Sequence, residues 1–244
     1  MVNIHSDWGK NMSIILKNIS KIYKSGEVET VALKNINLEI EEGEFVVILG
    51  PSGSGKSTLL NVISGLDSPS EGEIYFNDTK ISDYNEKQLT KFRRDYLGFI
   101  FQQYNLLQNL TVRENVEIGS AVSKDALGID EVLKSVSMYE KKDKYPYQLS
   151  GGEQQRVSIA RSIAKNPKIM FCDEPTGALD EKTGKQILNI IQIMNKNLNT
   201  TTVLITHNAN IAYMADTIIK MNSGKIVEVI KNEEKRKASE ILWA

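Results

Sequence analysis

A glycine-rich stretch, GPSGSGKST at residues 50–58, constrains the fold of this chain more than any other feature. It follows the apolar run FVVIL (45–49) and precedes KSTLLNVISG (56–65), whose apolar residues recur at helical spacing. A short continuous apolar run indicates a strand buried on both faces, and the closing Gly65 fits a helix end. Strand, glycine loop, Lys-Ser and helix in this order predict a phosphate-binding loop (P-loop) rather than an ordinary turn.

This loop is expected to hold the phosphates of a nucleotide. Its glycines permit backbone angles that turn successive N–H groups inward as an anion nest, and the helix N-terminus behind it adds partial positive charge. Lys56 should reach the β- and γ-phosphates, and the Ser57 hydroxyl should bind Mg²⁺. The predicted phosphate-site residues are Gly50, Pro51, Ser52, Gly53, Ser54, Gly55, Lys56, Ser57 and Thr58.

Two adjacent carboxylates end a second apolar run, KIMFCDE (168–174). A buried strand that delivers Asp173 to the P-loop is the usual source of a water-mediated Mg²⁺ contact, and Glu174 could orient and deprotonate an attacking water. The alternative, in which both carboxylates only cap the next helix, leaves charge at the end of a buried strand without a cation. These features alone also fit a small P-loop kinase, a GTPase or a motor, whose further motifs are not evident.

Strands alternate with helices along the chain, which predicts an α/β fold with a largely parallel sheet and helices on both faces. From about residue 86 to 164 the apolar residues recur at helical spacing, which indicates an inserted helical subdomain. We expect a single domain at 13–231, with a core of 13–90 and 165–231 and a helical subdomain at 91–164. The flanking parts are a leader at 1–12, either disordered or left over from cloning, and a charged tail at 232–244, either a solvated helix or a frayed end.

Composition limits the cell compartment and the partners. The formal net charge is -1 and the pI is about 6.2, which argues against nucleic acid as a partner. Cys172, the single cysteine, lies in an apolar run and is expected in the core, as in a protein of a reducing compartment. No apolar run approaches the ~20 residues of a membrane-spanning helix, and the leader does not resemble a secretion signal. We expect a cytoplasmic protein whose membrane role, if any, depends on a partner.

A second glycine pair, in LSGGEQQR (149–156), distinguishes this chain from other P-loop proteins. Ser150, Gly151 and Gly152 open a helical run and so form another donor-rich anion site. One nucleotide has one γ-phosphate, which Lys56 already holds, so the natural ligand of this segment is the γ-phosphate on a second copy of the chain. Two copies head to tail would bury two ATP molecules, with each ATP between one P-loop and one LSGG.

At these residues the chain resembles the nucleotide-binding subunit of ATP-binding-cassette (ABC) transporters, and the resemblance runs from about residue 13 to 229. It implies a P-loop NTPase core with an antiparallel β subdomain, and ATP and Mg²⁺ as cofactors. Family motifs also imply further site residues: Tyr23 stacked on adenine, Gln102 on Mg²⁺ and water, Glu153 in the signature, Asp180 at the dimer interface and His207 on the γ-phosphate. Glu153 stands where many members have Gln, and the helical segment is short.

The resemblance implies an ATP hydrolase that dimerises on ATP and drives a separate integral-membrane permease from the inner face of the membrane. Stretches such as CDEPTGALDEKTGK (172–185) are most similar to the branch that handles lipoproteins, macrolides and antimicrobial peptides. The alternatives are a polar amino-acid importer subunit and a soluble, non-transport ABC ATPase. The segment 104–115, with Leu106, Leu107 and Leu110, is the predicted docking site for a permease helix.

Overall fold

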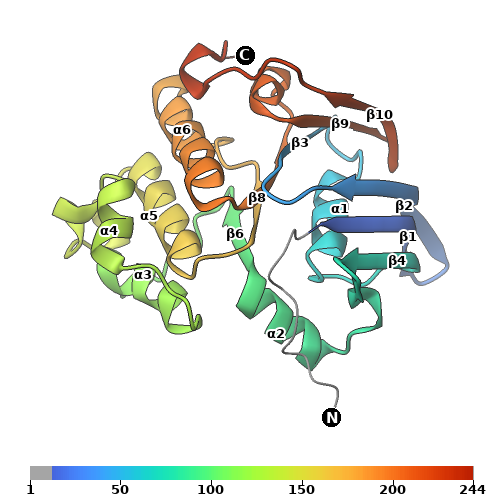
Figure 1. Cartoon of the computed structure of the whole chain (residues 1–244), viewed down its shortest axis with the longest axis horizontal. Coiled ribbons are helices and arrows are strands. Elements are labelled where there is room, and N and C mark those ends of the chain that lie inside the picture. Colours follow the sequence, from blue (N-terminus) through green and yellow to red (C-terminus); the bar gives the residue numbers. More distant parts are fainter. Residues whose placement is uncertain (1–12, 244) are drawn as a thin grey trace.

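The computed structural model describes residues 13–243, and the predicted leader at 1–12 lies outside them. Within this range the central sheet has six strands in the order β10–β9–β3–β8–β7–β6 (Figure 1). All neighbours are parallel except β9 and β10, which are antiparallel. The strands are β3 (Phe45–Leu49), β6 (Leu97–Phe101), β7 (Ile169–Asp173), β8 (Thr201–Thr206), β9 (Thr217–Asn222) and β10 (Lys225–Lys231).

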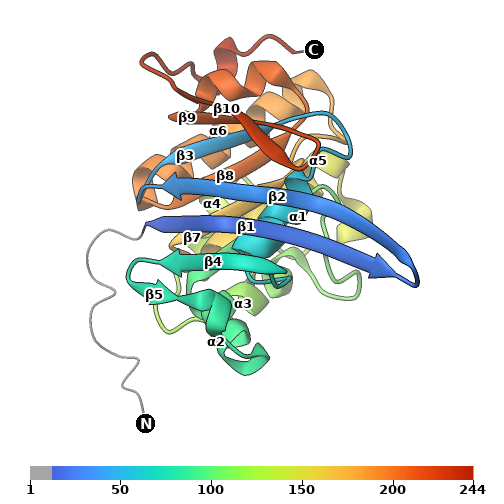
Figure 2. The same cartoon turned by 90° about the vertical axis from the view of Figure 1, so that its right-hand side faces the viewer.

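A second, antiparallel sheet has the strand order β2–β1–β4–β5. It is made of β1 (Ile14–Ser25), β2 (Val28–Ile40), β4 (Glu71–Phe76) and β5 (Thr79–Lys80). Figure 2 shows the long β1–β2 hairpin reaching well beyond β4. This sheet confirms the expected antiparallel subdomain, and the fold is the predicted α/β class.

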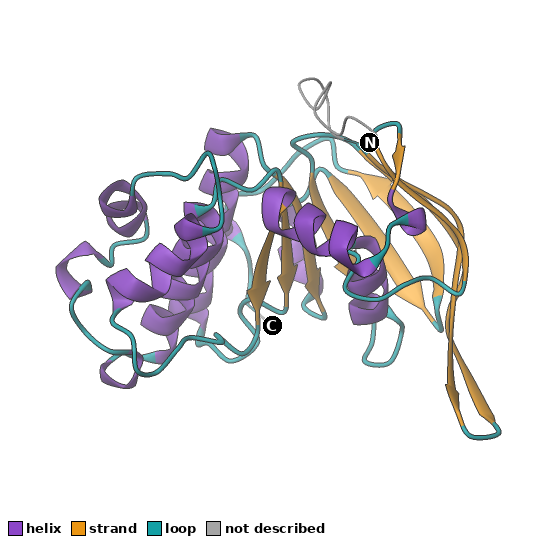
Figure 3. Ribbon diagram, turned by 90° about the horizontal axis from the view of Figure 1, so that it is seen from below, coloured by secondary structure: helices purple, strands orange, loops and turns teal. Residues whose placement is uncertain are grey.

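The helices divide between the two sheets and a separate group (Figure 3). The helix α1 (Lys56–Ile63) shares one apolar cluster with both sheets, and α2 (Glu86–Tyr96) leads into β6. The group at the far side consists of α3 (Val112–Ala121), α4 (Ile129–Ser135) and α5 (Gly151–Ala164), while α6 (Glu181–Leu198) joins β7 to β8. Short 3₁₀ helices occupy Ile81–Asp83, Tyr139–Lys141, Pro146–Gln148, Ala209–Met214 and Ala238–Glu240.

Strand β3 is buried on both faces, which explains why its sequence is apolar at every position. Phe45, Val47 and Leu49 belong to the apolar cluster on the α5–α6 side of the sheet. Val46 and Ile48 belong to the cluster on the α1 side. Because successive side chains point to opposite faces, burial of both faces requires a continuous apolar run. The strand ends at Leu49, so the P-loop, which starts at Gly50, lies at the carboxyl edge of the sheet.

The inserted subdomain begins later than the predicted residue 91. LGFIF at 97–101 is β6, which pairs in parallel with β7 and so belongs to the core. The preceding helix α2 carries helical spacing up to the strand, so the sequence pattern hid the change. Phe99 stacks on Phe171 with ring centroids 5.8 Å apart, and Gly98 packs so closely on Pro167 that a Cβ there would lie 3.0 Å from its ring. These contacts place β6, residues 97–101, with the core.

The charged C-terminal segment is not a solvated helix or a frayed end. It lies on α6, with Ala238 fully buried and Ile241 only 1% exposed. The sequence shows a charged stretch, but its few apolar residues face the core. Cys172 is fully buried, as predicted, and burial raises the pKa of its thiol well above the ordinary value. Between Ser13 and Trp243, none of the helices combines the length and the apolarity that crossing a membrane requires.

Candidate functional site

A cavity of about 630 Å³, called the P-loop cavity below, opens at the carboxyl edge of the central sheet. Its lining includes the P-loop after β3 and single residues that follow β6, β7 and β8, namely Gln102, Glu174 and His207. Parallel strands place their carboxyl ends at one edge of a sheet, where open α/β sheets bind ligands. The tertiary structure therefore brings together four parts of the sequence that we predicted to share a site.

The P-loop depends on glycine at two positions where the backbone is left-handed. Gly53 has φ +77° and Gly55 has φ +99°, which side-chain-bearing residues rarely adopt. A Cβ at Gly55 would also lie 2.7 Å from the Ala32 carbonyl oxygen of β2. Gly55 ends the loop as the N-cap of α1, whose first N–H groups have no partner within the helix. This geometry suits an anion at the helix N-terminus.

Lys56 is held inside the loop. Its ammonium donates hydrogen bonds to the carbonyl oxygens of Gly50, at 2.7 Å, and Pro51, at 3.0 Å, and the residue is only 8% exposed. These two carbonyls fix the cation beside the helix N-terminus, where a phosphate would add to its partners. The predicted contact of Lys56 with the β- and γ-phosphates stays a prediction.

Ser57 and Asp173 provide oxygen ligands suited to Mg²⁺. The Ser57 hydroxyl donates to Asp173 Oδ1 at 3.5 Å. Burial, followed by the neighbouring Glu174, raises the pKa of Asp173, and a cation at this point would reverse that effect. Among residues 13–243 there is no cluster of three or more His, Cys, Asp or Glu side chains that could hold a metal alone. Mg²⁺ usually combines one or two protein ligands with phosphate and water, and the Ser57 hydroxyl and the Asp173 carboxylate are oxygen donors of that kind.

Glu174 is paired with His207 across the mouth of the P-loop cavity. The His207 Nδ1 and Glu174 Oε1 atoms are 2.9 Å apart, with side-chain exposures of 68% and 18%. Glu174 has φ +47°, whereas the other described non-glycine residues with positive φ are Asn or Ser. Such backbone strain persists where the surroundings enforce it and clusters at functional sites. Here the Glu174 N–H donates to the Ile205 carbonyl at 3.0 Å, which ties it to β8.

Residues 149–156, called the signature segment, lie elsewhere on the same chain. Among the described residues that line the P-loop cavity, none belongs to this segment. Ser150 is exposed and is the N-cap of α5, where its hydroxyl accepts from the Glu153 N–H at 3.4 Å. As an acceptor in this bond, the hydroxyl keeps its proton available for an anion. The segment therefore lies outside the chain's own P-loop cavity, and its predicted role as a second anion site stays a prediction.

The comparisons with known proteins agree with this geometry. A family model described as "ABC transporter" matches residues 33–177. The bacitracin export ATP-binding protein BceA of Halalkalibacterium halodurans is 43% identical over 225 residues, which cover 90% of this chain and 89% of that protein. The chain belongs to the ABC transporter ATP-binding family.

Two further relatives extend the comparison. The ATP-binding protein MJ0796 of Methanocaldococcus jannaschii is 48% identical over 87% of this chain and 94% of that protein. Its dimeric post-hydrolysis structure with ADP and Pi superposes on this cassette with a TM-score of 0.81 over 89% of this chain and 98% of that chain. A putative ABC transporter ATP-binding protein of Mycoplasma pneumoniae is 47% identical over 94% of this chain, but the chain spans only half of its length. This cassette is therefore an ATP-binding ABC-type ATPase.

Glu153 and Asp180 form hydrogen bonds at the N-terminal ends of α5 and α6, the two helices that begin in family motifs. Glu153 accepts from the Ser150 N–H at 2.8 Å and pairs with Lys141, and this ion pair leads the effects that lower its pKa. Asp180 is the N-cap of α6 and accepts from the Thr183 N–H at 3.0 Å and its hydroxyl at 2.8 Å. In this structure both carboxylates contact their own helix, so their predicted nucleotide and interface roles stay predictions.

Tyr23 lies beside the P-loop cavity rather than in its lining. Its hydroxyl donates to Asp67 Oδ2 at 2.8 Å, and the Lys21 ammonium lies 4.9 Å from the ring centroid. Burial and Asp67 raise the pKa of Tyr23, while the Thr58 hydroxyl at the end of the P-loop lowers it. Tyr23 is 42% exposed, and its predicted adenine contact stays a prediction.

Six cavity residues were not predicted from the sequence. The β2 side of the cavity is lined by Thr30, Val31, Ala32 and Lys34, and the β9–β10 turn adds Ser223 and Gly224. They meet because the Lys34 N–H donates to the Gly224 carbonyl at 2.8 Å, which joins the antiparallel sheet to the edge of the central one. The NSG turn was visible in the sequence, but nothing there indicated that it would reach β2.

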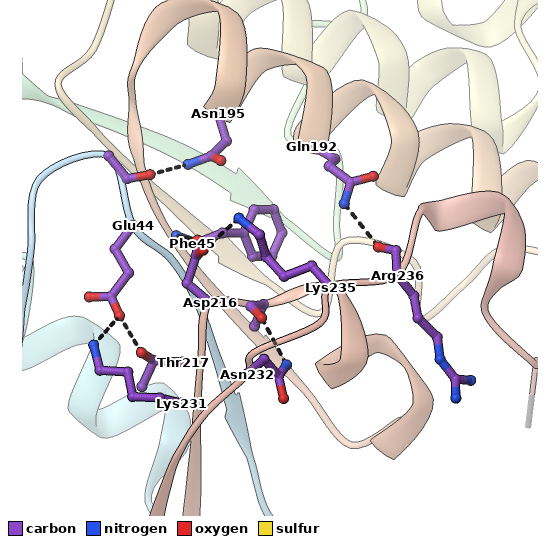
Figure 4. A network of polar contacts seen from close by, with 12 residues as sticks. Glu44, Phe45, Gln192, Asn195, Asp216, Thr217, Lys231, Asn232, Lys235 and Arg236 are labelled. Atoms are coloured by element: carbon purple, nitrogen blue, oxygen red, sulfur yellow. Dashed lines mark hydrogen bonds and ion pairs between the residues drawn. The ribbon is translucent and has the colours of Figure 1, made fainter.

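A larger hollow of about 770 Å³ lies at the opposite edge of the sheet, beside Glu44, Asp216 and Lys231. Its charged groups satisfy one another: Glu44 accepts from Lys231 at 2.8 Å and from Thr217, as Figure 4 shows. It has no P-loop and no helix N-terminus, so size does not make it the site of nucleotide chemistry. The smaller P-loop cavity, which has both, is the candidate functional site.

Proposed function

We propose that the chain is the ATP-hydrolysing subunit of an exporter, which dimerises on ATP and drives a separate integral-membrane permease. The observation that carries this proposal is that the signature segment, an exposed helix start, does not line the P-loop cavity of its own chain. A second copy supplies the missing half of each site. The bacitracin export relative supports the export branch over amino-acid import. The permease would hold the subunit at the cytoplasmic face of the membrane.

Within this site each residue has a proposed role. Mg²⁺ would be held by Ser57, Gln102 and Asp173, and it would neutralise charge on the β- and γ-phosphates. Glu174 would take the proton of the attacking water. His207, which is hydrogen-bonded to Glu174, would contact the γ-phosphate. Gln102 lines the P-loop cavity, and its amide nitrogen is 3.0 Å from where a Cβ of Gly177 would lie, so it borders the loop after Glu174.

The proposed dimer predicts a ligand-dependent change of mass. The wild-type subunit should be mainly monomeric, because each ATP joins the two copies. The Glu174→Gln form with ATP should sediment as a dimer, and the same form with ADP should not, since ADP lacks the γ-phosphate that the signature segment would bind. Sedimentation with no ligand, with ATP and with ADP tests this. One unchanged species under all three conditions would refute ATP-driven association.

The predicted docking segment, 104–115, consists of a loop at 104–111 and the first turn of α3, and Asn115 of that turn holds the loop by hydrogen bonds. The fully buried Asn115 accepts from the Leu107 N–H at 2.9 Å and donates to the carbonyls of Leu107 and Leu110 at 3.0 Å. Leu106 is 7% exposed and belongs to the core, whereas Leu107 is 47% exposed. Tyr104 is half-buried and its hydroxyl packs on Gly151, so it is not a clean docking probe.

Leu107→Asp should therefore prevent the ATPase subunit from binding the proposed permease. We expect the isolated subunit to keep its ATP affinity, because Leu107 lies outside the P-loop cavity. The permease should no longer co-purify, and export should be lost. Leu66→Asp, at a residue of equal exposure (46%) outside the segment, is the control. Intact assembly of the Leu107 variant would place the docking surface elsewhere, and a co-purified partner without membrane spans would overturn the transporter proposal.

A further inference from the structure

The C-terminal segment 232–243, called the strap, runs from the 3₁₀ helix Ala209–Met214 onto α6 (Figures 1 and 4). At its start, Asn232 donates to the carbonyls of Ala212 at 3.2 Å and Ala215 at 2.8 Å. Next, Lys235 pairs with Asp216 at 2.5 Å. The side chain of Gln192 on α6 then binds the strap backbone twice, donating to the Arg236 carbonyl at 3.1 Å and accepting from the Ala238 N–H at 3.3 Å.

The end of the strap occupies a place on α6 that a side chain would otherwise fill. Trp243 packs so tightly on the buried Gly184 that a Cβ there would lie 2.1 Å from the indole Cη2. Glycine inside a helix costs roughly 0.5–1 kcal/mol relative to alanine. Gly184 has no left-handed φ that would demand glycine. The contact with Trp243 is therefore the feature that requires glycine at this position.

The neighbouring residue of α6 makes the same kind of contact with the signature segment. Thr183 lies against Gly152, where a Cβ would be 2.1 Å from the threonine methyl. Thr183 also holds the Asp180 carboxylate through its N–H and its hydroxyl. In the first turns of α6, Thr183 thus contacts the signature segment and the next residue, Gly184, contacts the strap. The Arg156–Gln186 hydrogen bond, at 3.3 Å, is a second link between α5 and α6.

We propose that the strap is a positioning element of the two-chain ATP site, and that Trp243 is its positioning residue. This inference rests on the proposed function. Trp243 fixes the N-terminal turns of α6, and these turns fix the signature segment and Asp180, the surface that meets the ATP held by a second copy. The P-loop is instead braced by β2 through Gly55 and Ala32, so the strap acts on association and not on nucleotide binding by one chain.

The test compares Trp243→Ala with Leu242→Ala, both in the Glu174→Gln subunit. Leu242 adjoins Trp243 but is 70% exposed, so it controls for any change in the strap. Because residues along a contact network change coupling by about 0.5–2 kcal/mol, we expect Trp243→Ala to raise the dimer dissociation constant in saturating ATP by about 3- to 30-fold. The ATP affinity of the monomer, measured below the association range, should not change. Leu242→Ala should leave both quantities as they were.

Gly184→Ala provides a reciprocal test. In the presence of Trp243 the added methyl group displaces the indole and should weaken association as Trp243→Ala does. When combined with Trp243→Ala the methyl group enters vacated space, so the two effects should not add. Unchanged dimerisation of Trp243→Ala, or a lower melting temperature as its sole effect, overturns the inference. If the parent Glu174→Gln subunit itself fails to associate with ATP, the proposed function fails and the inference fails with it.

Discussion

Replacing Glu174 with Gln is expected to lower the rate of ATP hydrolysis by about 10²–10⁴-fold, the usual contribution of a general base. The substitution keeps the size and the hydrogen bonding of the side chain but removes its ability to take a proton. The His207 contact at 2.9 Å can persist with a glutamine amide, so the geometry of the site should remain. ATP affinity should therefore survive. Phosphate release and nucleotide titration on the same preparation measure the two quantities.

The control for this experiment is Glu228→Gln. Glu228 is an exposed β10 residue paired with Lys220 at 2.8 Å, so its loss removes one negative charge without reaching the P-loop cavity. The Glu228→Gln subunit should hydrolyse ATP at the wild-type rate. A Glu174→Gln subunit that turns over ATP at close to the wild-type rate would remove Glu174 from the role of general base.

Lys56→Ala and Ser150→Arg should each inactivate the protein, for different reasons. Hydrogen bonds to charged groups contribute about 1.5–3 kcal/mol, so Lys56→Ala should weaken ATP binding to its own subunit by about 10- to 10²-fold or more. Ser150 is exposed on the surface that would meet a second copy, so the bulk of arginine should block closure without affecting binding to the monomer. Nucleotide titration of each subunit alone distinguishes these defects.

Mixing the two inactive subunits should restore activity. A mixed dimer has one site with both defects and one site with neither, so part of the hydrolysis should return if a single intact site can turn over. Ser150→Ala is the matched control, because it loses the helix cap, at a cost of about 1 kcal/mol, but adds no bulk. If Ser150→Arg abolishes ATP binding to the monomer, the opposing-chain geometry is wrong.

The P-loop and the central strands were predictable because their signals are local. FVVIL and the IMFC part of KIMFCDE are continuous apolar runs, and both lie in strands buried on two faces. The glycines of the P-loop are required by the backbone of the loop itself, so the motif is legible without the fold. The edge strand β6 was missed because LGFIF directly follows a helix, and a five-residue run cannot be told from the helical pattern around it.

The sequence by itself determined which chemical groups are present: the phosphate-binding loop, the acidic strand end, the histidine and the second glycine pair. These groups lie in short segments that can be recognised from their own residues, although the left-handed backbone of Glu174 depends on its bond to β8. Only the tertiary structure decided which groups share a cavity, because the parallel order of β3, β8, β7 and β6 brings distant strand ends to one edge. It also decided that the charged C-terminal segment is packed, since burial of Ala238, Ile241 and Trp243 depends on a surface of α6 that no local pattern describes.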